Sequence, residues 1–163
     1  MLRTTTTATF LTLICTLSSI AQVSPDSDLH VQLYRMDSLI FEVGFNRCEM
    51  EVYDRIISDD LEFYHDQSGL SKTKQHFIEV ASKNICGNAN QKPIRKLVEG
   101  TMEVYPLSEN GVLYGAIQNG VHEFFIKEPG KEMYKTSEAK FTHVWLLKDD
   151  QWLLKRVLSF DHH

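Results

Sequence analysis

The sequence lacks most of the motifs that identify a particular chemistry. It has no glycine-rich phosphate loop and no Gly-x-Ser-x-Gly elbow, so neither nucleotide binding nor an α/β-hydrolase nucleophile is indicated. No run of Lys and Arg is longer than a pair, and we expect no nucleic-acid partner, because phosphate binding needs a concentrated basic surface. There is no internal repeat. With 163 residues, of which 42% are hydrophobic, the chain predicts a single domain with one core.

The first 21 residues predict a secretory signal peptide. Arg3 supplies a positive charge near the start, an apolar stretch follows, and small residues stand at Ser19 and Ala21. Cleavage after Ala21 removes Arg3, so the formal net charge changes from −5 to −6. We therefore expect a secreted or periplasmic protein.

Two other interpretations of this segment are weaker. A membrane anchor is disfavoured because Thr and Ser interrupt the apolar run, which is shorter than the roughly 20 residues that a span requires. A lipid anchor at Cys15 is disfavoured because the bulky Ile14 precedes it. We expect no membrane attachment after cleavage, a short linker over 22–27 and one domain over 28–163.

Cys48 and Cys86 are the only cysteines left after cleavage. In an oxidising compartment an even number of thiols favours a disulfide, which leaves no thiol nucleophile. Closing the intervening segment contributes roughly 4 kcal/mol in the chain-entropy model if the two Cα atoms lie close together. The alternative is two separate buried thiols.

Hydrophobic periodicity predicts helices first and strands later. Residues 28–47 carry apolar side chains at spacings of three and four, the pattern of a helix that lies across a broad apolar surface. A short helix over 49–58, a strand over 61–66, and a helix over 72–85 capped by Ser71 are expected next. The other predicted strands are 94–105, 112–127, 136–148 and 152–162.

The strand over 61–66 alternates in a way that separates its polar side chains. Leu61, Phe63 and His65 share one face, and Tyr64 and Asp66 share the other. If the strand is regular, only one of these sets lines a pocket.

The chain ends in a predicted hairpin that turns at Asp149 and Asp150. A two-residue turn pairs Leu147 with Trp152, Trp145 with Leu154, and His143 with Arg156. Both faces of this hairpin carry apolar residues: Phe141, Trp145 and Leu147 on one, and Val144, Leu146, Leu153 and Val157 on the other. Helices can cover one face, so we expect a second subunit on the other, in a sheet-to-sheet homodimer.

Segregated helices and strands predict an α+β domain with helices on one face of a curved antiparallel sheet. Several segments together resemble the nuclear transport factor 2-like (NTF2-like) superfamily, in its DUF4440 or SnoaL-like branch of secreted bacterial proteins. They are the strand Asp59–Asp66, the turn at Gly69, and the closing pattern of His143, Trp145, Asp149–Asp150, Trp152 and Ser159. The resemblance implies a cystatin-like cone with a pocket at its open end.

Known members of this superfamily include isomerases, cyclases and dehydratases, and also binding and assembly domains. Fold alone does not choose among these functions. Catalytic members carry an Asp or an Asp/His pair deep in the pocket, and those positions cannot be matched one by one here. Three hypotheses stay open: a pocket for a small, mostly apolar ligand, an isomerase, cyclase or dehydratase with a His/Asp couple, and a dimeric assembly module.

Histidine is the first candidate for chemistry because both of its forms are accessible near neutral pH. Four histidines lie in predicted strands: His65, His122, His143 and His162. We select His65 and His143 with Asp66 as catalytic candidates, the alternative being hydrogen-bonded wall residues. The ligand-binding candidates are Tyr64, His122, Trp145 and Phe160, although core packing is the alternative for the aromatic residues. The His-Glu-x-x-His spacing is missing, so we expect no metal, and no cofactor is expected.

Overall fold

A computed structural model describes residues 22–163, and the predicted signal peptide lies outside this range. Its elements are α1 Asp28–Ser38, η1 Leu39–Asn46 (a π-helix), α2 Val52–Ile56, β1 Ile57–His65, β2 Gly69–Ser71, α3 Lys74–Asn84, β3 Lys92–Leu97, β4 Glu103–Glu109, β5 Val112–Lys127, β6 Tyr134–Lys148 and β7 Gln151–Phe160. No helix in the described range is long and apolar enough to cross a membrane.

The seven strands form one sheet in the order β2-β1-β7-β6-β5-β3, and β4 also pairs with β5. The long β5 pairs with β3 near one end and with β4 near the other, so these two strands follow one another along its edge. The predicted α+β architecture with helices on one face of the sheet is confirmed. The sheet is mixed, however, because β1 pairs with β7 in parallel, where the sequence predicted antiparallel strands throughout.

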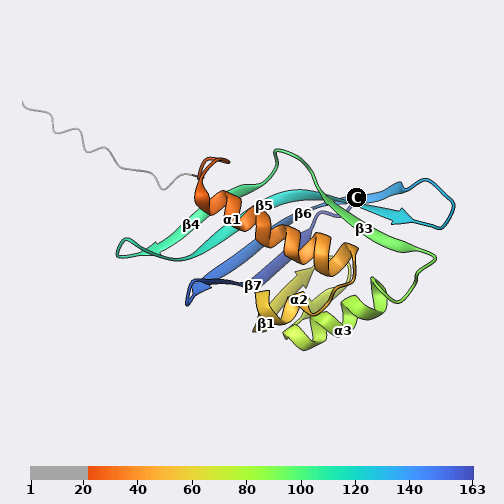
Figure 1. Ribbon diagram of the computed structural model, residues 1–163, viewed down its shortest axis with the longest axis horizontal. Helices are drawn as coiled ribbons and strands as arrows, with labels where there is room; N and C mark the ends of the chain where they lie inside the picture. Colours follow the sequence, from red (N-terminus) through yellow and green to blue (C-terminus); the bar gives the residue numbers. More distant parts are fainter. Residues whose placement is uncertain (1–21) are drawn as a thin grey trace, which may run out of the picture.

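The first helix lies across the sheet, as Figure 1 shows for the orange ribbon over β5, β6 and β7. Ser27 caps α1, its hydroxyl accepting from the backbone N–H of His30 at 3.2 Å. Leu33 and Ile40 are buried against the sheet, as the apolar stripe predicted. The second half of the predicted helix is a π-helix, in which Gly44 lies against the ring of Tyr53 and leaves no room for a Cβ atom.

Other helix and strand boundaries differ from the prediction because tertiary pairing overrides the local propensity of these segments. The second helix ends at Ile56, where the chain joins β1. Thr73 caps α3 in place of Ser71, which pairs with β1 instead. The strand predicted over 94–105 is two strands separated by a turn at Gly100, whose φ of 76° favours glycine.

A β-bulge in β7 changes the register of the last hairpin. Leu147 pairs with Trp152 and Trp145 with Leu154, as predicted. Beyond Lys155 the register shifts by one residue, so His143 faces Val157 and the predicted pair with Arg156 is wrong. The same shift places Val157 on the inner, helix-covered face of the sheet together with Trp145, whereas the sequence predicted these two residues on opposite faces.

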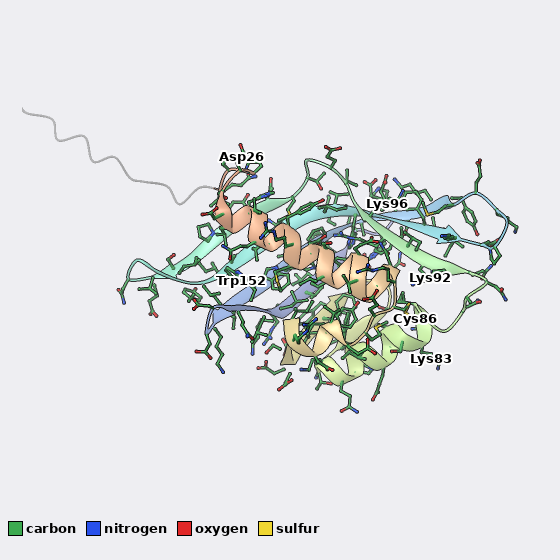
Figure 2. All side chains as sticks on the ribbon, in the orientation of Figure 1. Asp26, Lys83, Cys86, Lys92, Lys96 and Trp152 are labelled. Carbon is green, nitrogen blue, oxygen red and sulfur yellow. A yellow bond between two sulfur atoms is a disulfide. The ribbon has the colours of Figure 1, made fainter. Side chains whose placement is uncertain are left out.

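The predicted disulfide between Cys48 and Cys86 is present, with the two Cα atoms 5.9 Å apart. Cys48 follows η1 and Cys86 follows α3, so the bond joins the C-terminal ends of these two helices. Figure 2 labels Cys86 at that position, below the end of the first helix.

Polar contacts also tie the first helix to the edge strand β3. Asp37 and Arg95, both buried, form a two-pronged ion pair at 2.6 and 2.9 Å. The side chain of Asn46 bonds both backbone groups of Arg95, accepting from its N–H at 2.8 Å and donating to its carbonyl at 2.9 Å. The helix is therefore held over the sheet at a defined position.

Candidate functional site

A cavity of about 380 Å³ lies between the helices and the inner face of the sheet. Its walls come from η1, α2, α3 and strands β1, β3, β5, β6 and β7. The lining residues are Ile40, Phe41, Phe45, Tyr53, Phe63, His65, Gln67, Ser68, Phe77, Val80, Ala81, Asn84, Ile85, Pro93, His122, Phe124, Ser137, His143, Leu154, Val157, Ser159 and His162. This lining set contains no Asp, Glu, Lys or Arg, so the polar groups are mainly histidine, serine and amide side chains.

The sheet register brings the histidines together on the inner face. His65 pairs with Ser159, and Ser159 pairs with Phe141 on the neighbouring strand. His143 lies two residues further along β6 than Phe141, on the same face. His122 is on β5, and Leu97 on β3 is its cross-strand partner.

Asp66 and His162 form a close pair at one end of this cluster. Nδ1 of His162 lies 2.5 Å from a carboxylate oxygen of Asp66, whose other oxygen accepts from the backbone N–H of His162 at 3.2 Å. Burial acts to raise the pKa of Asp66, but the hydrogen bonds from His162 outweigh this effect and hold the pKa below its ordinary value. Asp66 is therefore an anion that orients the His162 ring through Nδ1.

His65 stacks on His162, with ring centroids 4.3 Å apart and planes 12° from parallel. Its Nδ1 accepts from the backbone N–H groups of Gln67 and Ser68 at 3.1 and 3.2 Å. Burial lowers the pKa of His65, and nearby His162 adds to the effect. Because an amide N–H is only a donor, Nδ1 is unprotonated and the ring proton is on Nε2.

His122 lies between Arg95 and Ser159 and contacts both side chains. Nε of Arg95 donates to its Nδ1 at 3.4 Å, and its Nε2 lies 3.5 Å from the hydroxyl of Ser159, which lies 3.4 Å from Nε2 of His162. Burial lowers the pKa of His122 to about 2, and the Arg95 charge contributes. His122 is therefore a neutral connecting residue, and its contacts are long for hydrogen bonds.

His143 is fully enclosed by the helix and the sheet. Its Nδ1 lies 3.1 Å from Oε1 of Gln118, and the same oxygen accepts from Nε1 of Trp145 at 2.8 Å. The ring of Phe41 stacks over it at 6.0 Å. Burial lowers the pKa of His143 to about 3, so this side chain is neutral at physiological pH.

In the described part of the chain, one group comes closest to a metal-binding arrangement: His65, Asp66 and His162, whose ligand atoms lie within 4.8 Å of one another. Two observations disfavour an ion there. Nδ1 of His65 already accepts two backbone hydrogen bonds, and stacked rings direct their in-plane lone pairs alongside one another rather than toward a common point. The arrangement suits proton transfer better than metal coordination.

The predicted site residues lie in three places: around the cavity, in the hydrophobic core and on the outer face of the sheet. His65, His122 and His143 line the cavity. Asp66, which follows the last residue of β1, is not among the lining residues and is connected to the cavity through its contact with His162. Trp145 is fully buried and supports Gln118 rather than lining the cavity.

Tyr64 and Phe160 lie elsewhere. They border a shallow hollow of about 400 Å³ that also involves Leu70 and Leu158, whose side chains are about 40% exposed. These exposed residues alternate with the cavity-lining residues of the same strands, so they lie on the outer face.

Two polar residues that connect the cavity histidines, Ser159 and His162, were not selected from the sequence. His162 was recognised as a strand histidine but not assigned a role, and Ser159 was noted only as part of the closing pattern. The pairing of His162 with Asp66 joins residues 96 positions apart, and no local pattern reports such a contact. The one indication in the sequence is that Asp66 and His162 both lie at the ends of predicted strands.

No protein-family model and no curated protein matches the chain's sequence. Solved structures do match its fold. An NTF2-like superfamily protein from Salmonella enterica serovar Typhimurium has a TM-score of 0.60 at 12% identity, over 82% of this chain and 92% of that chain. A calcium/calmodulin-dependent protein kinase II association domain from Xanthomonas campestris has a TM-score of 0.63 at 14% identity, over 87% and 93%.

A third similar structure is an enzyme, the type 2 hexachlorocyclohexane dehydrochlorinase LinA. Its TM-score is 0.59 at 17% identity, over 82% of this chain and 88% of that chain. The chain therefore has the NTF2-like cone fold that the sequence predicted, and its structural neighbours include an enzyme and a kinase association domain. The DUF4440 or SnoaL-like branch stays a prediction.

Proposed function

We propose that the protein binds a small, mostly apolar molecule in the cavity of the cone. The observation that carries this proposal is the cavity itself: about 380 Å³, walled mainly by aliphatic and aromatic side chains, with a few polar groups facing inward. This volume is within the range of about 300–1,000 Å³ that is typical of small-molecule sites. Burial of apolar ligand surface supplies the affinity, and the histidines supply orientation.

Filling the cavity tests the proposal. Ser137 lines the cavity, whereas the neighbouring Thr136 is exposed. Ser137→Trp should abolish binding of tetralin, measured by ligand-observed NMR, and Thr136→Trp should leave it unchanged. Native mass spectrometry of the purified wild-type protein should also show a retained small molecule that Ser137→Trp lacks. Equal tetralin binding by both variants contradicts a ligand site in the cone.

Proton transfer is a second candidate function, favoured by the 2.5 Å contact between His162 and Asp66. A carboxylate that orients an imidazole through Nδ1 makes Nε2 the basic nitrogen, which can take a proton from a substrate carbon, as in eliminations and isomerisations. In His162 this nitrogen has only a long contact of 3.4 Å with the Ser159 hydroxyl, which a substrate can displace. In this state His162 accepts the proton and Asp66 stabilises the resulting imidazolium. The Nε2–H of His65 is available to a developing oxyanion.

Hydrogen exchange tests this candidate without knowledge of the natural substrate. The wild-type protein should accelerate exchange of the C2 hydrogens of 1-tetralone in D₂O, followed by mass spectrometry. His162→Gln should remove the acceleration, and His76→Gln, which changes an exposed histidine on α3, should not. No acceleration by the wild-type protein, or equal acceleration by His162→Gln, argues for binding alone.

We also infer that two copies associate through the outer face of the sheet. Tyr64, Leu70, Leu158 and Phe160 expose apolar surface there, and a second copy is a partner that covers it symmetrically. Phe160→Glu should convert a dimer to a monomer in light scattering, while Val112→Glu, at the exposed first residue of β5, should not. The disulfide supports the prediction of an oxidising, extracytoplasmic location.

A further inference from the structure

Trp145 determines which ring nitrogen of His143 carries the proton, although no hydrogen bond joins these two side chains. The indole N–H of Trp145 is only a donor, so the Gln118 atom that it contacts at 2.8 Å must be the oxygen. That oxygen also faces Nδ1 of His143 at 3.1 Å. An oxygen is an acceptor only, so Nδ1 carries the proton and Nε2 has a lone pair.

This lone pair faces the cavity. Within residues 22–163, every buried side-chain nitrogen or oxygen that is sealed from solvent has a hydrogen-bond partner. Nε2 of His143 has no partner in that range, although the residue is only 1% exposed. The small surface that this atom retains must therefore face the cavity that His143 lines. Nε2 of His143 is therefore a hydrogen-bond acceptor that a donor group of a ligand can use.

His65 presents the opposite character. Two backbone N–H groups occupy its Nδ1, so the proton is on Nε2, and this N–H has no acceptor in the described part of the chain. His65 is on β1 and His143 on β6, with β7 between them. His143 also lies one inward-facing position further along, at the level of Phe63. The acceptor and the donor are thus separated across the cavity.

The other two histidines do not add free groups of this kind. His122 and His162 are both within 3.5 Å of the Ser159 hydroxyl, and their Nδ1 atoms contact Arg95 and Asp66. The cavity lining includes no Asp, Glu, Lys or Arg. A ligand with a formal charge in the deep part of the cavity would have no counter-ion there, which is costly in an apolar site.

We propose that the ligand is an uncharged molecule with a hydrogen-bond donor at one end and an acceptor at the other, of the hydroxy-ketone class. Its hydroxyl donates to Nε2 of His143, and its carbonyl accepts from Nε2–H of His65. This inference rests on the proposed function, since it names the class of molecule that the same cavity selects. Trp145 makes Nε2 of His143 the hydrogen-bond acceptor, and the turn after β1 makes Nε2–H of His65 the donor.

Two measurements test this. Long-range ¹H–¹⁵N NMR of the imidazole rings reports the tautomers directly and needs no ligand. It should show His143 protonated at Nδ1 and His65 protonated at Nε2 at pH 7. The opposite tautomer at either residue overturns the proposal.

The second measurement compares four probes of one shape by calorimetry or ligand-observed NMR. They are 6-hydroxy-1-tetralone, which has both groups, 6-methyl-1-tetralone, which has only the acceptor, 5,6,7,8-tetrahydro-2-naphthol, which has only the donor, and tetralin, which has neither. One neutral hydrogen bond should increase affinity by about 3- to 10-fold, so the hydroxy-ketone should bind more tightly than either singly substituted probe by this factor.

The variant His143→Phe identifies which group of the ligand His143 recognises. His143→Phe keeps an aromatic ring beside Phe41 but removes the acceptor, so the advantage of 6-hydroxy-1-tetralone over 6-methyl-1-tetralone should disappear while its advantage over the naphthol persists. If all four probes bind equally, the selectivity proposal fails and the apolar pocket stands. If none of the four binds, including tetralin, the proposed function itself fails. The tautomer measurement on the wild-type protein does not depend on how the variant folds.

Discussion

The buried ion pair between Asp37 and Arg95 offers a sharp test of the forces that hold the first helix over the sheet. The two side chains are only 5% and 3% exposed, and they meet through two hydrogen bonds of 2.6 and 2.9 Å. Removing one partner leaves the other charge buried without compensation. Asp37→Leu or Arg95→Met should therefore each lower the free energy of unfolding by about 3–5 kcal/mol.

The double variant should behave differently. When both charges are replaced by apolar side chains of similar volume, no unpaired charge is left, and the cost should be below about 2 kcal/mol. Arg95 also stacks on the ring of Phe41 at 3.8 Å and donates to His122, so some packing loss remains. Urea unfolding of the four proteins measures the coupling directly.

The pH dependence gives a second signature. Burial raises the pKa of Asp37, and the Arg95 charge opposes that rise. Without Arg95 the folded protein holds a proton on Asp37 more tightly than the unfolded chain does. The resulting stabilisation is complete below the ordinary Asp pKa and is lost as pH rises through the folded-state value. Arg95→Met should therefore be less destabilising at pH 4 than at pH 8. Additive single effects, or a cost independent of pH, would refute this account of the pair.

Three further predictions concern stability. Reducing the disulfide that joins Cys48 to the end of α3 should lower the free energy of unfolding by about 4 kcal/mol, because the sequence separation is 38 residues; an unchanged urea midpoint under reductant would contradict this. His122 and His143 have folded-state pKa values of about 2 and 3, below the ordinary value of about 6.5, so stability should be complete above pH 6.5 and fall by about 1.4 kcal/mol per pH unit for each of them as pH drops. His143→Phe should remove half of that contribution, as pH-dependent urea unfolding would show. Gly44→Ala should destabilise the protein by about 1–3 kcal/mol in thermal or urea unfolding, because the new methyl group meets the buried ring of Tyr53, and a neutral effect would mean that this ring moves freely.

Several elements could be predicted because their signal is local. The strand over residues 112–127 matches β5 at both ends, and the hairpin turn at Asp149 and Asp150 sets the first cross-strand pairs of β6 and β7. The disulfide could be predicted because only two cysteines follow the expected cleavage site. Each of these inferences depends on residues near one another in the chain or on a simple count.

The site depended on contacts that no local pattern records. The bulge near Lys155 turned Val157 inward and separated His143 from Arg156, and a single extra residue in a strand leaves no reliable trace in a hydrophobic pattern. The parallel pairing of β1 with β7 brought His65 beside Ser159 and placed Asp66 next to His162. A sequence can show that these residues are polar, but not that they meet.

By itself, the sequence determined the amphipathic first helix, the meander of long strands and the pair of cysteines that link the helices, since periodicity and residue count are properties of the chain alone. Only the tertiary structure decided which face of each strand is enclosed, and which nitrogen of each histidine carries its proton. The physical reason is that a tautomer is set by its partners. Trp145, Gln118 and His143 come from two neighbouring strands, and their hydrogen bonds exist only once the sheet has formed.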